Sequence, residues 1–587
     1  MKKIYLIVLL GYLMFACNDD FLDRYPQTEI TEANFFNNVT DLRTYTFQFY
    51  DYLYLSTRDI PSDNTTLEKG SMRDMLLGNI TADNYTGWSK NTWSRLRSIN
   101  YFLKYYSKAE GEESDKNKYA AVARFFRARD YIGKVQTYSD VPWYSSTLET
   151  TDETLYKPRD TRELVVDSII TDLEYATMHL KDDDDKTMLS KWAAYFKLAR
   201  FCLYEGTYRI YHKGETDLHV TKAPEYFLNK AVEAANAIMK SGKFVIQMGD
   251  VNEVYGDLFN GVTDLQSSPE VIMYLDYEDD KRQHGAELVL DFENGVSRSF
   301  ADSYLKTDGS FVPSTELDTL QVTDVYTDRD PRMKQTLFYP GWIHPNTELV
   351  YKLPIVKTGG YGQIKFLPKE KGKNYDEWYG CYTDLPLYRY AEVLLIYAEA
   401  KAELGQLTQD DLDKTINVLR DRVGVGHMMM NPAVDPTQEA LYPNVTSAQK
   451  AEILEIRRER RIELFGEGRR YNDMMRWKVG KLFEKAQQGI YVPPSGLVDM
   501  TGDSIPDYFI SDDGSNKPSD LPDGVTFLIT NNDDIPIYLE KGKSGHVMFK
   551  LERGDFGTFV EPKYYYRPIP TSEILLNPNL KQLFGWD

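Results

Sequence analysis

Apolar residues recur mostly at helical spacing along this chain. In residues 91–109, NTWSRLRSINYFLKYYSKA, the side chains of Trp93, Leu96 and Ile99 fall on one stripe of a helix. The same periodicity predicts four more helices, over 118–135, from Thr161 to Leu180, from Ser190 to Gly206 and from Pro224 to Gly242. Thr161 and Ser190 are typical N-cap residues, and a proline start with a glycine end follows the usual asymmetry of helix termini.

Three helical segments share one composition. They are AAVARFFRARDYIG at 120–133, WAAYFKLARFCLYEG at 192–206 and RYAEVLLIYAEAKAELG at 389–405. Each has alanines near both ends, bulky residues between them and a terminal glycine. Small residues let a neighbouring helix approach closely, as in the helix pairs of tetratricopeptide-like arrays. The irregular spacing predicts scattered pairs of helices and not a regular solenoid.

The helical pattern breaks off twice. Residues 245–382 and 493–563 are rich in Gly, Pro, Asp and Tyr, and their apolar runs are short. Such stretches predict long loops with short β-hairpins, and long loops inside a compact body usually carry function. The predicted fold class is therefore mainly α, a helical scaffold that displays large irregular loops.

The N-terminus has the pattern of a bacterial lipoprotein signal. Two lysines precede an uncharged segment from Ile4 to Phe15, which as a helix would span about 18 Å, too short for a bilayer. Ala16 and Cys17 follow at once, and in such signals the thiol accepts a diacylglyceryl group. Met14 stands where leucine is usual. The alternative is a plain signal peptide that ends by chance at a cysteine.

Composition indicates an exported, acidic body. The formal net charge is −21, and a surface this acidic repels phosphate backbones, which argues against nucleic acid as a partner. No apolar run of bilayer length follows Cys17. The two remaining cysteines, Cys202 and Cys381, lie in apparent helix and loop interiors, so we expect free thiols. Tyrosine outnumbers phenylalanine, 44 to 27, which fits a surface that handles polar ligands.

The motifs of common catalytic sites are absent. The chain has no HExxH, GxSxG, P-loop or GxGxxG, and its seven histidines never fall at metal-ligand spacing. We therefore assign no catalytic residue, metal or cofactor, although 90 acidic residues leave the carboxylate pair of a glycosidase open. The basic run RRERR at 457–461 alternates with glutamates, which predicts ion pairing within its own helix.

Eight stretches, in order, resemble those of SusD/RagB-type outer-membrane lipoproteins over essentially the whole chain. They are CNDDFLDRYPQTEIT at 17–31, WSRLRSINYFL at 93–103, YSDVPW at 138–143, DRDPRMKQTLFYPG at 328–341, PLYRYAEVLLIYAEAKAELG at 386–405, LRDRVGV at 419–425, RRERRIELFGEGRRYNDMMRW at 457–477 and YRPIPTSEILLNPNLKQLFGW at 566–586. Each stretch is weak alone, and their order makes the resemblance specific.

The resemblance implies a function, a partner and a place in the cell. Members of this family are non-catalytic nutrient-binding proteins, most often for glycans, that sit at the cell surface over a SusC-type TonB-dependent transporter. It implies an outer-membrane, surface-facing protein attached only through Cys17, with acids after the cysteine that resemble a surface-export signal. A peptide- or glycopeptide-binding lid of the same transporter system remains an alternative, and a glycoside hydrolase is a further one.

The resemblance also implies a division of the chain. Residues 1–16 would be the signal peptide, and residues 17–40 the lipid-anchored tether with the start of the mature chain. An N-terminal helical region would follow at 41–244, and a C-terminal region with the loop insertions at 245–587.

Three tryptophans are candidates for stacking on a sugar ring. Trp88, Trp342 and Trp378 lie in the predicted loops NYTGWSKN, YPGWIHPN and YDEWYGCY, whereas the other five lie in helical or family-like stretches and are expected in the core. A flat ring on a loop can stack against the C–H face of a sugar. Each of the three could equally anchor its own loop by packing.

Polar partners for the ligand are expected near Trp88. The family resemblance places the ligand face at this N-terminal loop region, together with the irregular insertion. The preceding stretch SDNTTLEKGSMRD offers Asp63, Asn64 and Arg73, and the guanidinium fork of arginine suits paired hydroxyls. The predicted ligand-binding set is thus Asp63, Asn64, Arg73, Trp88, Trp342 and Trp378.

The lipid anchor gives the first testable prediction. Replacing Cys17 by alanine removes the only thiol that could be acylated at the end of the apolar segment. We expect the Cys17→Ala protein to leave the membrane fraction of expressing cells and to appear in the soluble fractions. If the variant stayed in the membrane pellet to the same extent as the wild type, the anchor would lie elsewhere.

Overall fold

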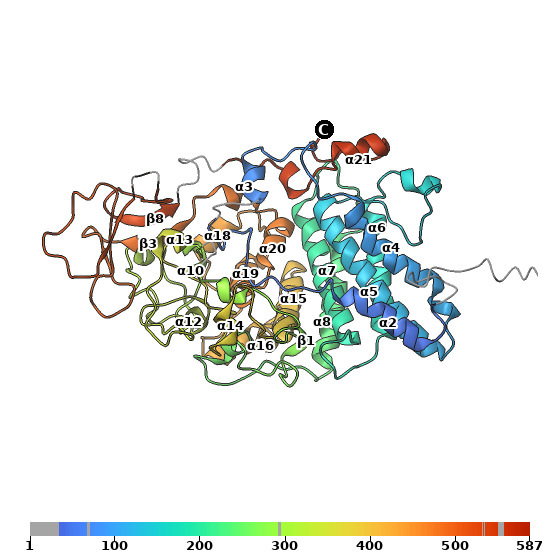
Figure 1. The fold of residues 1–587 in the computed structure, drawn as a ribbon, viewed down its shortest axis with the longest axis horizontal. Coiled ribbons are helices and arrows are strands. Elements are labelled where there is room, and N and C mark those ends of the chain that lie inside the picture. The colour runs from blue at the N-terminus through green and yellow to red at the C-terminus, as the bar shows by residue number, and fades with distance from the viewer. Residues whose placement is uncertain (1–34, 67–70, 291–294, 531, 533, 550–556) are drawn as a thin grey trace, which may run out of the picture.

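The computed structural model describes residues 35–66, 71–290, 295–530, 532, 534–549 and 557–587 (Figure 1). Cys17 and the predicted signal peptide lie outside the described residues, as does most of the predicted tether. Within the described ranges, no helix is both long and apolar enough to cross a membrane.

Most helices of the first half pack side by side in one layer (Figure 1). They are α2 (Val39–Tyr50), α4 (Lys90–Tyr105), α5 (Glu113–Tyr138), α6 (Arg162–His179), α7 (Lys191–Tyr211) and α8 (Pro224–Lys240). The short helix α3 (Ser71–Leu76) lies apart from this layer, and its methionines pack into a core cluster made mainly of second-half residues. The predicted caps are confirmed: the hydroxyls of Thr161 and Ser190 accept hydrogen bonds from the backbone N–H three residues later. Helices α5 and α6 pack as one pair, and α7 and α8 as another, so the prediction of helix pairs is confirmed.

Gly206 does not end its helix as predicted, because α7 continues past it to Tyr211. Helix α5, predicted over 118–135, runs through Gly133 and ends at Tyr138. A Cβ at Gly206 would lie 2.8 Å from the side chain of Leu228 on α8, so this glycine permits close packing of two helices. The third glycine of the set, Gly405, behaves as predicted: it follows α15 with φ of +68°.

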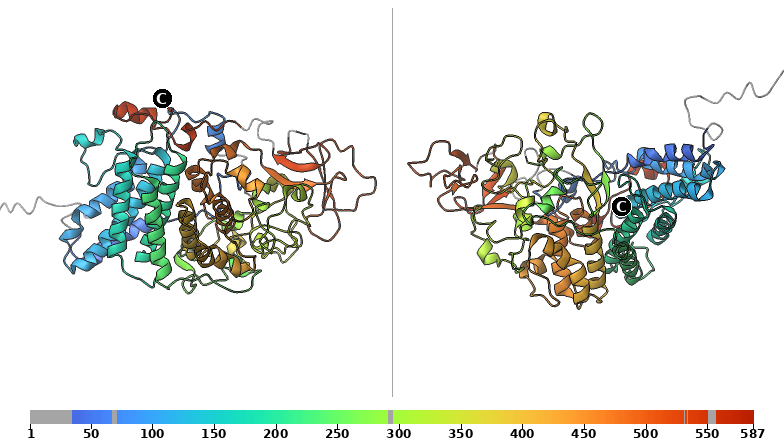
Figure 2. Two further views of the ribbon diagram at one scale, coloured as in Figure 1. Left: turned by 180° about the vertical axis from the view of Figure 1, so that it is seen from behind. Right: turned by 90° about the horizontal axis from the view of Figure 1, so that it is seen from below.

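The second half mixes helices with long irregular segments. Its helices are α9 (Val254–Asp257), α10 (Arg298–Ala301), α11 (Ser314–Leu317), α12 (Arg332–Thr336), α13 (Ile355–Thr358), α14 (Lys373–Asp376), α15 (Tyr390–Glu403), α16 (Gln409–Lys414), α17 (Ile416–Val423), α18 (Pro436–Leu441), α19 (Lys450–Glu463), α20 (Arg470–Arg476) and α21 (Thr571–Leu576). Helix α15 packs against α7, α8 and α19, which joins the two halves. Figure 2 shows these yellow and orange helices beside the green ones of the first half.

Within the described residues, the strands are short and form three small sheets. They are β1 (Val271–Leu275), β2 (Leu385–Arg389), β3 (Gln488–Val492), β4 (Leu497–Val498), β5 (Tyr508–Ser511), β6 (Thr526–Ile529), β7 (Ile537–Leu539) and β8 (Gly545–Phe549). The pairs β4–β5 and β7–β8 are local antiparallel pairs, as predicted. The pairs β1–β2 and β3–β8 join strands far apart in the sequence, and β5–β6 is parallel, which no local turn signal predicts.

Both remaining cysteines are free thiols, as predicted. Cys202 lies on α7 and Cys381 in the loop before β2, and both are buried. Burial raises the pKa of each thiol, so neither forms a thiolate readily.

A network of buried ion pairs joins the elements of the second half at α19. Glu463, at the end of this helix, accepts hydrogen bonds from Arg422 at 2.5 Å, Arg332 at 2.9 Å and Arg389 at 3.0 Å. These arginines come from α17, α12 and the last residue of β2, and all four side chains are no more than 1% exposed. One carboxylate therefore ties four separate segments together.

This network corrects the prediction that the arginines of RRERR pair within their own helix. Arg458 does pair with Glu455, one turn earlier. Arg460 instead reaches Asp473, and Arg461 reaches Asp63. Pairing one turn apart is a device of exposed helix faces, whereas α19 is buried on every side from Glu452 to Glu463. A buried charge needs several strong partners, and only other segments can supply them.

Removing the charge of Glu463 should destabilise the fold strongly. Burial alone would raise the pKa of this carboxyl, but Arg422, Arg389 and Arg332 outweigh it and hold the pKa well below its usual range. Glu463→Gln removes a shared carboxylate from three buried arginines, each of which keeps another acidic partner, and should cost about 3 to 5 kcal/mol in urea unfolding. The exposed pair of Glu439 and Lys450 is the control, and Glu439→Gln should cost at most about 1 kcal/mol.

The pH dependence of stability gives a second readout. A lowered pKa stabilises the fold above the unfolded-state pKa of about 4.3, and this contribution is lost as pH falls. The wild type should therefore lose stability below about pH 4 more steeply than Glu463→Gln does. Equal stability of the variant and the wild type at neutral pH would contradict the role given to this carboxylate.

Candidate functional site

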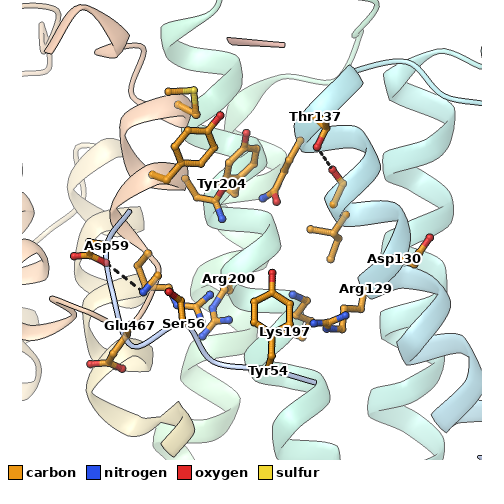
Figure 3. Close-up of a pocket in the computed structure, with 18 of the residues that line it drawn as sticks. Tyr54, Ser56, Asp59, Arg129, Asp130, Thr137, Lys197, Arg200, Tyr204 and Glu467 are labelled. Atoms are coloured by element: carbon orange, nitrogen blue, oxygen red, sulfur yellow. Dashed lines mark hydrogen bonds between the residues drawn. The ribbon is translucent and has the colours of Figure 1, made fainter. Parts of the chain in front are cut away.

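A cavity of about 700 Å³ lies where the two halves of the chain meet. Its wall is formed by the loop at 53–61, by α5 and α7 of the helical layer, by the end of β2 and by the segment at 467–475 that contains α20. Figure 3 shows this arrangement, with Tyr54 and Ser56 on the loop facing Lys197 and Arg200 on α7. The volume falls in the range of roughly 300 to 1,000 Å³ that ligand pockets occupy.

Helical periodicity sets which side chains reach the cavity. On α5, Arg129, Ile132, Gly133 and Gln136 lie one turn apart and line it. A Cβ at Gly133 would meet no atom within 4 Å, so this glycine leaves open space at the cavity wall. On α7, Lys197, Arg200 and Tyr204 form the matching stripe.

Tyrosines form much of the wall. Those that line the cavity are Tyr54, Tyr85, Tyr204, Tyr388, Tyr471 and Tyr565. Tyr54 is 70% exposed, so its ring is accessible, whereas Tyr204 and Tyr565 are buried. Burial raises the pKa of both buried phenols, so they remain protonated hydrogen-bond donors at neutral pH.

Two of the three carboxylates of the wall accept hydrogen bonds or form close ion pairs. Asp59 accepts hydrogen bonds from the backbone N–H groups of Gly466 and Gly468. Glu467 is paired with Lys365 and Arg389. The third, Asp130, lies 3.5 Å from the ammonium of Lys134. Burial raises the pKa of Asp59, although its hydrogen bonds partly offset this effect.

The loop that carries Tyr54 is fixed to α19 and α20 by its own acids. Asp63 is 3% exposed and accepts hydrogen bonds from Arg470 at 2.6 and 2.7 Å and from Arg461 at 3.2 Å. These two arginines hold the pKa of Asp63 at about 2 in spite of its burial, which acts in the opposite direction. Asn64 is fully buried and bridges Asp59 and Arg461.

Asp63 and Asn64 therefore lie inside the protein and position the loop. Their polar atoms are used by Arg461, Arg470 and Asp59, which leaves no surface for direct contact with a ligand in this structure. The sequence-based choice of these two residues as ligand contacts is not supported by their placement. The polar run at 62–64 therefore anchors its loop to the rest of the protein and does not form an open surface.

Trp88 and Trp342 are mainly packing residues. Trp88 is 5% exposed, and its ring lies 5.1 Å from that of Trp93 and 4.9 Å from that of Tyr138. Its remaining surface faces a second, more apolar cavity of about 600 Å³. Trp342 is 9% exposed and lies edge-on to Phe338. Both therefore take the alternative role of loop anchors. Arg73 is half-buried on α3.

Trp378 is the predicted tryptophan that lies on the surface. It is 70% exposed, and the adjacent Tyr379 is 63% exposed. The backbone N–H of Tyr379 donates to Glu287 at 2.5 Å, and Gly285, nearby in sequence, accepts a hydrogen bond from Arg58 of the 53–61 loop. The Trp378–Tyr379 pair is thus linked to the loop that lines the cavity.

None of the six predicted ligand residues lines the 700 Å³ cavity. The structure instead brings together Tyr54, Arg129, Lys197, Arg200 and Arg469. Sequence reasoning treated the helices that hold Arg129 and Lys197 as packing elements only. The signal was present as long cationic residues at one-turn spacing within alanine-rich, otherwise buried helices.

A metal site is not evident in the part of the chain that the structure describes. No group of three or more His, Cys, Asp or Glu side chains there is placed to hold an ion.

Two family models match the sequence. The model described as "SusD family" matches residues 269–586, which is more than half of the chain. The model described as "Starch-binding associating with outer membrane" matches residues 20–203.

Curated relatives match at low identity. The SusD-like protein P2 of Formosa agariphila is 25% identical over 521 residues, which cover 81% of this chain and 91% of the relative. The SusD-like protein P38 of the same organism is 22% identical over 80% of this chain and 90% of the relative. A SusD-like protein of Bacteroides ovatus is 28% identical, but over 34% of this chain and 39% of that protein.

Solved structures share the fold over nearly the whole chain. A SusD-like protein of Bacteroides fragilis superposes with a TM-score of 0.66 at 18% identity, covering 96% of this chain and all of that chain. A SusD-like carbohydrate-binding protein of the same species gives 0.65 at 21% identity, covering 93% and 99% of the two chains. A structure solved with a xylogluco-oligosaccharide gives 0.56 at 17% identity, covering 92% and 97%.

The two tryptophans Trp88 and Trp378 should respond differently to substitution. Trp88→Ala empties a packed aromatic cluster and should lower the free energy of unfolding by about 3 to 5 kcal/mol. Trp378→Ala removes an exposed ring and should change it by no more than about 0.5 kcal/mol. Urea unfolding of both variants measures this, and equal destabilisation by the two substitutions would contradict the assignment.

Proposed function

Because the chain belongs to the SusD family, we propose that it captures an oligomeric nutrient, a glycan, without altering it and delivers it to a SusC-like TonB-dependent outer-membrane transporter. The fold shared with SusD-like structures, one of them a carbohydrate-binding protein and one solved with a xylogluco-oligosaccharide, supports the binding part of the proposal. Family membership supports the transporter as partner.

The tyrosine-lined cavity is the observation that carries the proposal. A sugar offers apolar C–H faces and many hydroxyls, so a site for it needs rings to stack on and polar groups at the edges. The exposed ring of Tyr54 supplies a stacking surface at the cavity. Buried phenols such as Tyr204 and planar polar groups such as Gln136 supply hydrogen bonds.

The exposed Trp378–Tyr379 pair is proposed as a second contact surface. Both rings are more than 60% exposed, and their segment is hydrogen-bonded toward the loop that carries Tyr54. An oligomer longer than the cavity could therefore contact both surfaces. Trp378 is the member of the predicted ligand set that we retain as a stacking residue.

The proposed place of action is the outer surface of the outer membrane. The lipoprotein signal pattern that ends at Cys17 supports a lipid anchor, and the description "associating with outer membrane" of the second family model agrees with that location. The anchor would leave the described helical body free at the surface, beside the transporter.

The engaged acids of the cavity weigh against a glycoside hydrolase there. Hydrolysis needs a carboxylic acid that protonates the leaving oxygen and a second carboxylate free to reach the sugar or a water. The cavity acids Asp59 and Glu467 are instead hydrogen-bonded or ion-paired with protein groups. A peptide- or glycopeptide-binding lid of the same transporter system is the alternative that a binding experiment separates.

Tyr54 should matter for glycan binding and not for folding. Loss of its exposed ring in Tyr54→Ala should weaken binding of the bound glycan by about tenfold, or about 1.4 kcal/mol, with an unchanged melting temperature. Isothermal titration of a panel of plant and algal oligosaccharides and of peptides into the wild type first identifies the ligand. Tyr226 on α8, which is 41% exposed, gives the matched control Tyr226→Ala.

The same incubations distinguish the alternatives. Chromatography of the oligosaccharides after prolonged contact with purified protein should show no shorter products. Time-dependent cleavage would favour the hydrolase, and binding of peptides without glycans would favour the peptide lid. Full affinity in Tyr54→Ala would place the glycan site away from this cavity.

A further inference from the structure

Six cationic side chains line the tyrosine-rich cavity, and in the described ranges Arg200 alone among them pairs with a carboxylate. Arg200 is held by two hydrogen bonds to Glu392, at 2.8 and 2.6 Å. Arg567 donates to nearby backbone carbonyls, and Arg95 lies 4.2 Å from the centre of the Tyr52 ring. In the described ranges, neither Lys197 nor Arg469 forms a hydrogen bond or ion pair, and Arg129 only lies over the ring of Tyr54, at 5.7 Å.

This excess of positive charge is unusual for the chain. The protein carries 90 acidic against 69 basic residues, so a cation finds a carboxylate more easily than the reverse. The surface lysines do so: Lys414 pairs with Asp410 and Lys281 with Glu278. Inside the second half, even fully buried arginines such as Arg389 are paired. The cavity is thus a place where several cationic side chains gather without forming an ion pair to any described residue.

The cavity cations also repel one another. Burial together with the nearby Arg200, Arg129 and Arg469 lowers the pKa of Lys197 well below its usual value. Burial and Arg200 lower the pKa of Arg469 to about 10. An arrangement of this kind destabilises the empty protein, and an anion in the cavity would relieve it.

We propose that this cavity binds an anionic group, a carboxylate or a sulfate, carried by the oligosaccharide that the protein captures. This inference rests on the proposed function and names its ligand class. The arrangement of the cavity wall suits an acidic sugar. The Tyr54 ring offers a stacking face beside Arg129, and the cationic ends of Lys197 and Arg200 lie next to Tyr54 (Figure 3).

The wall chemistry suits both anions. A guanidinium offers a fork of donors that matches two oxygens of a carboxylate or a sulfate, and an ammonium adds a compact point charge. Two hydrogen bonds to Glu392 fix the guanidinium of Arg200, while the side chains of Lys197 and Arg469 remain available to bind an anion. The cavity acids Asp59 and Glu467 bond to Lys365, Arg389 and backbone amides, and neither forms an ion pair with Lys197 or Arg469.

The test uses pairs of probes that differ only in charge. The small pair is galacturonate and galactose, with sodium sulfate as the second anion and sodium chloride as the ionic-strength control. The large pair is a hexamer of galacturonic acid and the same hexamer after reduction of its carboxyls. Calorimetric titration and melting curves are recorded for the wild type, for Lys197→Met and Arg469→Met, and for the surface control Lys414→Met, whose lysine is 63% exposed.

The wild type and Lys414→Met should bind galacturonate or sulfate, and should prefer the acidic hexamer to its neutral twin by about tenfold or more. Lys197→Met and Arg469→Met should lose most of this preference and keep their affinity for the neutral twin. Both variants should melt at or above the wild-type temperature without ligand, because each removes a repelled cation. A preference for sulfate over galacturonate would identify the anion as a sulfate ester.

Two results with the small anions and the cavity variants would overturn the inference. One is the absence of binding by both small anions to the wild type, and the other is an acidic preference that survives in both cavity variants. Neutral glycans that bind with the same affinity as acidic ones would also overturn it while leaving the proposed function intact. Conversely, anion binding that depends on Lys197, in a protein that binds no glycan from a broad panel, would contradict the proposed function alone.

Discussion

The fold depends on the buried charge network around Glu463. This carboxylate and the nearby Glu467 pair with arginines from α12, α17 and the end of β2, and with Lys365. All of these partners lie in a region with few long helices or strands. Such charges cost several kilocalories per mole to bury and are stable only when every partner is in place. The segments that meet at α19 are therefore fixed by specific ion pairs as well as by apolar packing.

The same network positions the candidate site. Arg461 and Arg470, from α19 and α20, extend it to Asp63, and Asp59 of the same loop accepts backbone N–H groups at the turn between these helices. The loop that carries Tyr54 is thereby held against α5 and α7, and the cavity forms between them. The contrast between the two places is informative. In the network every arginine has its carboxylate, whereas the cavity leaves Lys197 and Arg469 without one, so a ligand can supply the missing charge.

Local patterns predicted the helices well, whereas the candidate cavity depends on contacts between distant segments that no local pattern shows. The caps at Thr161 and Ser190 and the helix pairs follow from nearest-neighbour chemistry, and an ordered set of motifs identified the family. Gly206 was misjudged because its role is to admit Leu228, 22 residues away, and a one-dimensional pattern does not show that contact. Asp63 and Trp88 belong to predicted loops, yet both are buried because Asp63 pairs with Arg470 and Trp88 packs on Tyr138. The cavity residues come from segments as distant as 54, 197 and 469, which only the fold brings together.

A crystal structure of the protein with the acidic oligosaccharide it binds most tightly would test the central claim directly. We expect a sugar ring stacked on Tyr54, with its carboxylate or sulfate between Lys197 and Arg469, and Asp63 still paired with Arg470. Ligand density at another surface, with the cavity between the loop at 53–61 and α7 occupied by water alone, would contradict it.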